Sequence, residues 1–144
     1  MLTNEKGLAE QVVDIARRAG DAIMTIYATD FAVDTKDDLS PVTAADQAAE
    51  DVILTAIDAE IARVFPVVSE EAASAGHIPS VDEKPFWLVD PLDGTTNFAA
   101  GIPYWAISVA RFVDGLPVQA FLDVPALRQR IVAIRGEGVW RNGK

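Results

Sequence analysis

The chain has 144 residues, and half of them are hydrophobic, so it can form one packed domain over residues 1–144. Twelve Lys and Arg residues stand against 22 Asp and Glu residues, and the net charge of −10 argues against nucleic acid or an anionic membrane as a partner. There is no cysteine, no apolar run of the ~20 residues that a membrane span needs and no signal-peptide pattern, so we expect a cytoplasmic protein.

Two amphipathic helices are predicted in the first half of the chain. In the first, apolar residues recur every three or four positions from Leu8 to Ile26, which is typical of one buried helix face. Residues 30–40 are polar and could hold a short strand or a turn. The same apolar spacing predicts a second helix that begins near Thr43 and ends before Pro66.

Short apolar runs follow, and they predict strands. The runs occupy residues 66–68, 86–89, 104–113, 116–124 and 130–135. We expect the first two to be buried, with a surface loop over 72–85 between them. Asp114-Gly115 separates the third and fourth runs, which is a hairpin signal. Two helices followed by partly antiparallel strands indicate an α+β fold.

Acidic residues gather directly after the run at 86–89. Asp90 and Asp93 are three residues apart, with Pro91 setting a bend between them. If the bend is tight, both carboxylates and the Leu92 carbonyl could converge on one hard cation such as Mg²⁺. The backbone amides of Gly94, Thr95 and Thr96 would then form an anion-binding helix start beside the cation.

Each of these features also has a purely structural interpretation. Asp-Gly is common in turns, and Thr95 could simply cap a helix. Glu70 and Glu71 at the end of a strand could be a solvated turn, and Lys36 a surface lysine. Thr43-x-x-Asp46 matches a capping box.

Three segments in this order, residues 36–46, 69–71 and 90–95, resemble the inositol monophosphatase superfamily. Its members are lithium-sensitive, magnesium-dependent phosphomonoesterases. The ending 134–143 also looks like the glycine-rich hairpin in the middle of such chains. The resemblance implies the N-terminal portion of a layered αβαβα fold, with two long helices packed on a mostly antiparallel sheet.

The resemblance also implies roles for individual residues, with Mg²⁺ as the cofactor and a small phosphorylated molecule as the substrate. The residues that match metal ligands are Glu70, Asp90, Leu92 through its carbonyl, and Asp93. Those that match catalytic groups acting on the attacking water are Asp46, Thr95 and Glu70. Phosphate or substrate contacts match Asp93, Gly94, Thr95 and Thr96. Accessory positions are Lys36, Thr43 and Glu71.

Two branches of the superfamily compete as models for the substrate. Residues 38–46 and 67–71 look closer to the bacterial 3′(2′),5′-bisphosphate nucleotidases, which act on adenosine 3′,5′-bisphosphate. Residues 96–98 and 101–108 look like the inositol monophosphatases. Since the residues after Thr95 lie nearest the substrate, we expect inositol monophosphate or a similar polyol phosphate.

The chain departs from the family pattern in length. Family members run to about twice this length, and their second half carries a Trp-Asp motif whose aspartate completes the metal site. Here Trp105 precedes Ala106 and Trp140 precedes Arg141, so the chain resembles the N-terminal half only. It is either a fragment of a longer product or a shortened homologue. In the second case it could be a non-catalytic metal-binding or dimerisation module, since an exposed sheet edge favours a homodimer.

Overall fold

The structure, a computed structural model, describes residues 5–29, 33–35, 41–61, 66–77, 80–81 and 85–144. Its elements follow in chain order as α1 (Glu5–Tyr27), β1 (Val33–Thr35), β2 (Pro41–Thr43), α2 (Ala44–Ala56), the π-helical turn η1 (Ile57–Ile61), β3 (Val67–Ser69), α3 (Glu70–Ser74), β4 (Phe86–Asp93), α4 (Thr95–Ala99), β5 (Ala106–Val113), β6 (Leu116–Val124), the 3-10 turn η2 (Pro125–Leu127), β7 (Gln129–Ile134) and β8 (Gly138–Arg141).

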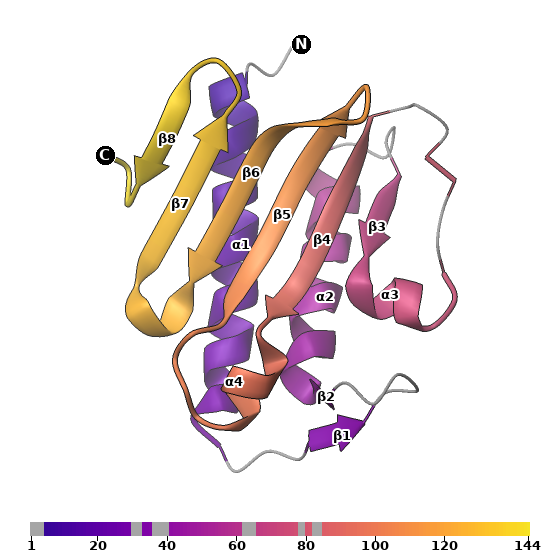
Figure 1. Ribbon diagram of the computed structural model, residues 1–144, viewed down its shortest axis with the longest axis vertical. Helices are drawn as coiled ribbons and strands as arrows, with labels where there is room; N and C mark the ends of the chain where they lie inside the picture. The colour runs from indigo at the N-terminus through magenta and orange to yellow at the C-terminus, as the bar shows by residue number, and fades with distance from the viewer. Residues whose placement is uncertain (1–4, 30–32, 36–40, 62–65, 78–79, 82–84) are drawn as a thin grey trace.

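The strands β3 to β8 form one sheet in their chain order, and β1 and β2 form a separate hairpin (Figure 1). The β3–β4 pair is parallel, and every other neighbouring pair in the sheet is antiparallel. The expected α+β class and the mostly antiparallel sheet are confirmed. The predicted hairpin turn is also present, since Asp114 and Gly115 both have positive φ, at 52° and 74°.

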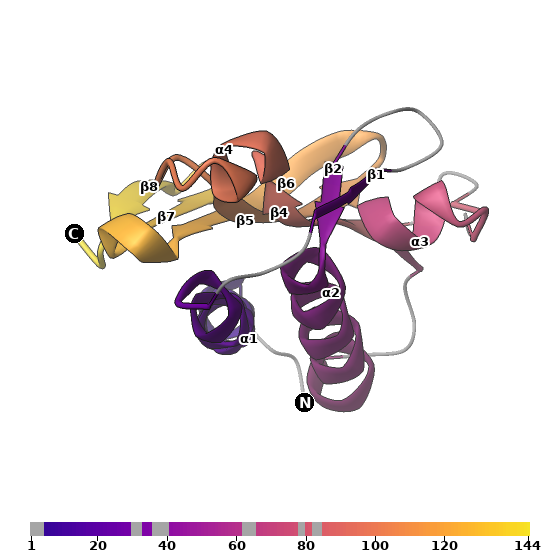
Figure 2. The same ribbon diagram turned by 90° about the horizontal axis from the view of Figure 1, so that it is seen from below.

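The two long helices pack side by side on one face of the sheet (Figure 2). The helix positions expected from the apolar spacing are buried there, together with the inward-facing residues of β4 and β5. Among the side chains in this core are Ile15, Ile23, Ile53, Trp87 and Ile107. None of the described helices is long and apolar enough to cross a membrane.

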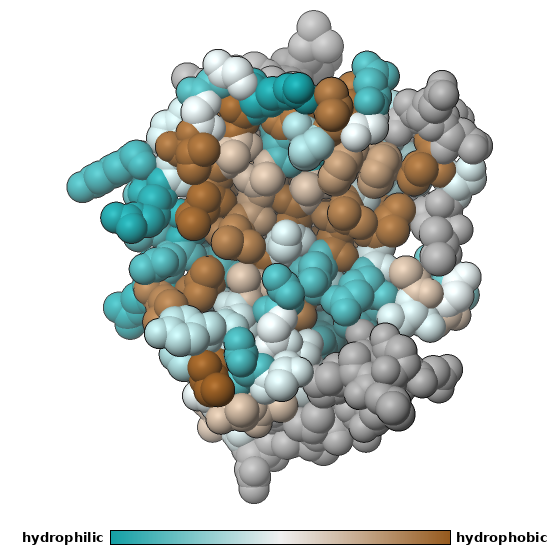
Figure 3. Space-filling view, in the orientation of Figure 1, coloured by the Kyte–Doolittle hydropathy of each residue, from teal (hydrophilic) through white to brown (hydrophobic). Residues whose placement is uncertain are grey.

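The opposite face of the sheet carries an apolar band that runs across all six strands (Figure 3). The strand registers align one row of it, which consists of Val68, Leu88, Ala110, Ala120, Ala133 and Val139. Leu88 and Val139 are exposed, and no described element covers this face. The expectation that the strands at 66–68 and 86–89 are fully buried is therefore wrong, because only one face of the sheet packs against helices.

Other differences from the sequence prediction lie at strand ends. The strand expected to stop at Asp90 continues to Asp93, with a register shift between these residues that accommodates Pro91. Residues 72–74 are helical rather than loop, because α3 begins directly after β3. The glycine-bearing turn after β7 leads into a further strand, β8, which the hydrophobic pattern did not predict, but which forms with β7 the glycine-rich hairpin implied by the resemblance.

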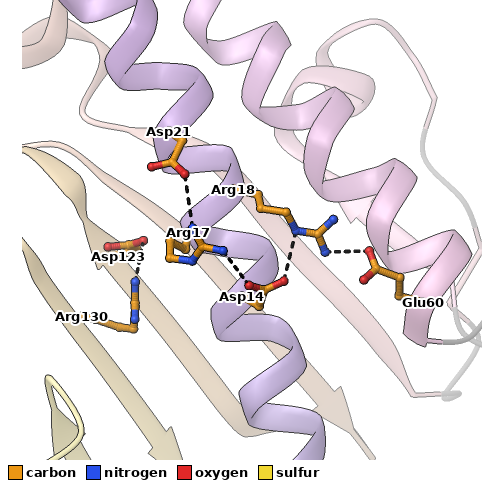
Figure 4. A network of polar contacts seen from close by, with 7 residues as sticks. All are labelled: Asp14, Arg17, Arg18, Asp21, Glu60, Asp123 and Arg130. Atoms are coloured by element: carbon orange, nitrogen blue, oxygen red, sulfur yellow. Dashed lines mark hydrogen bonds and ion pairs between the residues drawn. The ribbon is translucent and has the colours of Figure 1, made fainter.

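An ion-pair network links the two long helices at the surface (Figure 4). Arg18 on α1 contacts Asp14 one turn earlier at 3.2 Å and Glu60 in η1 at 2.6 Å. Since these side chains are all more than one-third exposed, water screens each pair and its contribution to stability is small. The apolar core, not this network, holds the helices on the sheet.

An aromatic cluster fixes the short helix α4 at one end of the sheet. The ring of Phe98 lies 5.1 Å from Tyr27 and 5.2 Å from Trp105, measured between centroids. Gly94 precedes α4 with a φ of +92°, and a Cβ built there would lie 3.0 Å from the Tyr104 carbonyl oxygen. Gly94 is therefore required both for its backbone conformation and for the close approach of the Tyr104 carbonyl, just before β5.

We predict that Gly94→Ala lowers the free energy of unfolding more than Gly101→Ala does. Both glycines have positive φ, but a Cβ at Gly101 meets nothing within 4 Å. Backbone strain of about 1 kcal/mol is common to both variants, and the clash at Gly94 should add about 1–3 kcal/mol. Urea unfolding measures the difference. Equal losses of unfolding free energy in the two variants would show that the Tyr104 carbonyl does not approach Gly94 as closely as described.

Candidate active site

The parallel pairing of β3 and β4 brings two acidic residues together. Ser69 pairs with Val89, so the next residues along the chain, Glu70 and Asp90, lie beside each other where β3 ends, with Asp90 still in β4 and paired with Ser108. Glu70 is the first residue of α3, and its side chain is exposed. Both residues line one cavity, and Glu70 affects the Asp90 carboxyl through a hydrogen bond and through charge repulsion.

The irregular end of β4 adds the remaining predicted ligands to this edge. The register shift lies between Asp90 and Asp93, and Leu92 between them is buried. The result is an open cavity of about 200 Å³ at the junction of β4 and α4. Its lining consists of Glu70, Asp90, Leu92, Asp93, Gly94, Thr95 and Thr96. All predicted metal and phosphate positions therefore share one cavity.

Asp46 does not line this cavity, but a hydrogen bond links it to Thr95, which does. The Thr95 hydroxyl donates to Asp46 Oδ1 at 2.9 Å, and the Leu92 carbonyl oxygen lies 3.2 Å from the same hydroxyl. Asp46 itself is fully buried in the first turn of α2. A pair 49 residues apart in the chain is thus brought into direct contact.

The capping box predicted at Thr43 is also present. The backbone amide and the hydroxyl of Thr43 both donate to Asp46 Oδ2, at 2.9 and 2.7 Å. In return, the Thr43 hydroxyl accepts from the Ala45 amide. The structural and functional interpretations of Asp46 are therefore compatible, since one carboxylate oxygen caps α2 and the other faces Thr95. The alternative that Thr95 is a helix cap is wrong, because Gly94 occupies the N-cap position of α4.

The pKa of Asp90 is raised from its ordinary value of 3.8 to about 8, and burial is the largest cause. The hydrogen bond that the protonated Asp90 carboxyl donates to Glu70 and the negative charges of Glu70 and Asp93 contribute to this rise, while a backbone hydrogen bond at Leu92 opposes it. Asp90 Oδ1 is buried, and it accepts no hydrogen bond from the described residues. A site with crowded carboxylates and an unsatisfied oxygen favours a cation as the missing partner.

The donor set fits a hard divalent cation, because carboxylate and carbonyl oxygens are the ligands that Mg²⁺ prefers. Within the described ranges, however, no three acidic or histidine side chains are arranged closely enough to hold a metal ion by themselves. Glu70, Asp90 and Asp93 line a common cavity rather than a closed metal cage. Their role as metal ligands therefore stays a prediction.

Some predicted residues lie away from the cavity. Glu71 is buried in α3 and does not line it, so the solvated-turn interpretation is wrong for Glu71, whereas the exposed Glu70 begins α3 and lines the cavity. Asn97, expected near the substrate, instead donates to the Tyr104 carbonyl at 2.9 Å and ties α4 to the start of β5. Lys36 lies outside the described residues.

Glu50 was not singled out from the sequence. It follows Asp46 by one turn of α2, and this spacing of four residues places both on the same helix face.

The chain matches known proteins over nearly all of its length. A family model for the inositol monophosphatase family covers residues 4–144. The chain is 38% identical over 136 residues to the 3′(2′),5′-bisphosphate nucleotidase CysQ of Salmonella typhimurium, which is 93% of this chain and 54% of that protein. It is 30% identical over 131 residues to the inositol monophosphatase of Mesembryanthemum crystallinum, which is 91% of this chain and 48% of that protein.

The fold agrees with these sequence matches. The extragenic suppressor protein suhB from Bartonella henselae superimposes with a TM-score of 0.83 and 29% identity, over 95% of this chain and 52% of that one. The chain thus spans about half the length of the relatives that it matches. Since the family model covers almost every residue, the chain belongs to the inositol monophosphatase family.

Proposed function

We propose that this chain carries the catalytic carboxylates of a Mg²⁺-dependent phosphatase that hydrolyses a small phosphomonoester. The observation that supports the proposal most directly is the cavity shared by Glu70, Asp90 and Asp93 with Thr95, whose hydroxyl is bonded to Asp46. In the reaction, the oxygen of water bonds to phosphorus and the phosphorus–oxygen ester bond breaks. The products are an alcohol and inorganic phosphate.

Carboxylates alone would repel a phosphate dianion, so the site needs a cation. Glu70, Asp90, Asp93 and the Leu92 carbonyl are the residues that would hold Mg²⁺. When bound, Mg²⁺ would neutralise this charge and stabilise the negative charge on the phosphoryl group. The chain itself contributes the fixed positions of these oxygens, because each lies at the end of a paired strand or at the start of a helix.

Asp46 and Thr95 are suited to orienting and deprotonating the attacking water. The hydroxyl proton of Thr95 is directed toward Asp46, so the lone pairs of this hydroxyl can accept a hydrogen bond from water in the cavity that Thr95 lines. Asp46 can then take a proton through Thr95. Full burial shields the Asp46 carboxylate from bulk water, while Thr95 connects it to the cavity.

The proposed substrate is a phosphorylated polyol, with inositol monophosphate as the leading candidate. Thr96 lines the cavity, and it belongs to the segment that resembles the inositol monophosphatases. The second candidate is adenosine 3′,5′-bisphosphate. The 38% identity to a bisphosphate nucleotidase is what supports this second candidate.

Three other expectations stay predictions. They are a cytoplasmic location, a homodimer, and the possibility that the 144 residues alone form a non-catalytic metal-binding or dimerisation module. The exposed apolar band on the sheet is the feature that would favour association of the chain.

We predict that Mg²⁺ raises the Tm, and that the increase becomes larger as the pH passes 8. In the metal-free chain, the raised pKa of Asp90 means that its stabilising contribution is complete below pH 3.8 and is lost as the pH rises to about 8. Above pH 8 the ionised group should bind Mg²⁺ in place of its proton. At Mg²⁺ a hundredfold above the dissociation constant, the increase should be roughly 5 to 10 °C.

Differential scanning fluorimetry at pH 6, 7, 8 and 9 measures this effect. Asp51→Asn is the matched control, because Asp51 is an exposed acid on α2 away from the cavity, and it should behave like the unchanged chain. Asp90→Asn should abolish the pH dependence of the Mg²⁺ effect. A Tm increase that is the same at every pH would contradict a role for Asp90 in binding.

Release of inorganic phosphate from a substrate panel tests the proposed activity. The panel contains inositol 1-phosphate, histidinol phosphate, fructose 1,6-bisphosphate and adenosine 3′,5′-bisphosphate, each assayed with Mg²⁺ and with EDTA. We expect Mg²⁺-dependent turnover that is fastest with inositol 1-phosphate. Asp93→Asn should lower kcat roughly 100-fold or more, whereas Asp51→Asn should leave it unchanged.

The panel should be run on the 144-residue chain and on the whole product of its reading frame. A preference for the bisphosphate nucleotide would reverse the order of the two candidates. Mg²⁺ binding without turnover in either protein would favour the non-catalytic module and contradict the proposed activity.

A further inference from the structure

A second buried acid on α2 lies beside the proposed site without lining it. Glu50 follows Asp46 by four residues, so both carboxylates are on the same face of the helix, one turn apart. Only 4% of Glu50 is exposed. A buried carboxylate needs several hydrogen bonds to offset its loss of hydration, so its partners indicate what it does.

Glu50 binds the segment that carries Glu70. Its Oε1 atom accepts hydrogen bonds from the Ser69 hydroxyl and from the Ala72 amide, the latter at 3.0 Å. Its Oε2 atom accepts from the Gln47 side chain at 2.9 Å, within α2 itself. One oxygen is therefore used entirely by the corner between β3 and α3.

These contacts replace the usual cap of α3. Ser69 occupies the N-cap position, but its side chain makes no capping bond within α3. The Ala72 amide, at the third position of α3, is the donor that an N-cap side chain would ordinarily satisfy. Glu50 satisfies it instead, from a residue 22 positions earlier in the chain.

The position of α3 depends on this contact because the helix is short. It contains five residues, and a helix of that length is not stable by itself in water. Glu70 is its first residue, so any movement of the corner displaces the Glu70 carboxylate relative to Asp90. Asp46 holds the segment from Asp90 to Thr95 in a similar way, because it accepts the hydrogen bond of the Thr95 hydroxyl at the start of α4.

We infer that Glu50 is a positioning residue, which caps α3 from α2 and so holds Glu70 at the distance from Asp90 that a shared cation requires. This inference rests on the proposed metal site and deepens it. Glu50 and Asp46 lie on successive turns of α2. Together, their contacts set the distance between the corner that carries Glu70 and the segment from Asp90 to Thr95.

Mg²⁺ titration by isothermal calorimetry, at a temperature where each variant is folded, tests the inference. Glu50→Ala should raise the Mg²⁺ dissociation constant 10-fold or more, which is the usual effect of removing a group that orients a metal ligand. Glu50→Gln keeps an oxygen for Ser69 and Ala72, so its dissociation constant should stay within about threefold of the original. Gln47→Ala removes only the contact within α2 and should have no effect.

Hydrogen exchange of the Ala72 amide supplies a readout that needs no metal. Exchange should be at least tenfold faster in Glu50→Ala and close to the original rate in Glu50→Gln. If Glu50→Ala does not fold, Ser69→Ala removes one of the two bonds and should still raise the dissociation constant about threefold.

The outcomes separate this inference from the proposed function. A folded Glu50→Ala variant with unchanged Mg²⁺ affinity would overturn the positioning role while leaving the metal site intact. A parent chain that binds no Mg²⁺ would overturn the metal site and, with it, the positioning of a ligand. In that case, unchanged Ala72 exchange in Glu50→Ala would also overturn the cap.

Discussion

The hydrogen bond between Thr95 and Asp46 joins the second helix to the end of the fourth strand, and the proposed site depends on it. This bond fixes the segment from Asp90 to Thr95 to α2 at the point where β4 becomes irregular and the five-residue helix α4 begins. Asp46 can serve this purpose because its other oxygen is already fixed by the amide and hydroxyl of Thr43. A carboxylate that is anchored on one side is a rigid acceptor on the other.

The surrounding fold maintains this geometry with apolar packing. Phe98 and Trp105 are almost completely buried beside Tyr27, so α4 cannot rotate away from the sheet without exposing aromatic surface. The parallel register of β3 with β4 brings Glu70 to the same edge of the sheet. Packing and strand pairing thus hold acidic groups close together although they repel one another. A bound cation would remove this repulsion, which favours its binding.

The sequence predicted local features better than contacts between distant segments. The spacing of apolar residues located α1 and α2, the Asp114-Gly115 pair located a hairpin, and Thr43-x-x-Asp46 located a capping box. Each of these signals lies within a few residues. The bond from Asp46 to Thr95 was expected only through the family resemblance, because no local pattern connects positions 49 residues apart.

The predictions that failed depended on tertiary structure in a similar way. Short apolar runs were expected to be buried on both sides, but Leu88 is exposed because only one face of the sheet is covered by described elements. The Asn97 side chain has a partner that no local pattern predicted, because the Tyr104 carbonyl is beside it only after the chain turns back toward β5. Glu50 was overlooked because its partners, Ser69 and Ala72, are near it only after folding.

A double-mutant cycle with Asp46→Ala and Thr95→Val tests the central contact most directly. The quantity to measure is the free energy of unfolding of the parent chain, both single variants and the double variant, in the absence of metal. We predict an interaction energy of roughly 1–3 kcal/mol between the two sites, because Thr95→Val leaves an oxygen of the fully buried Asp46 without its partner and Asp46→Ala deprives the half-buried Thr95 hydroxyl of its acceptor. Losses that add to within about 0.5 kcal/mol would show that Asp46 and Thr95 are not coupled and would contradict this account of the site.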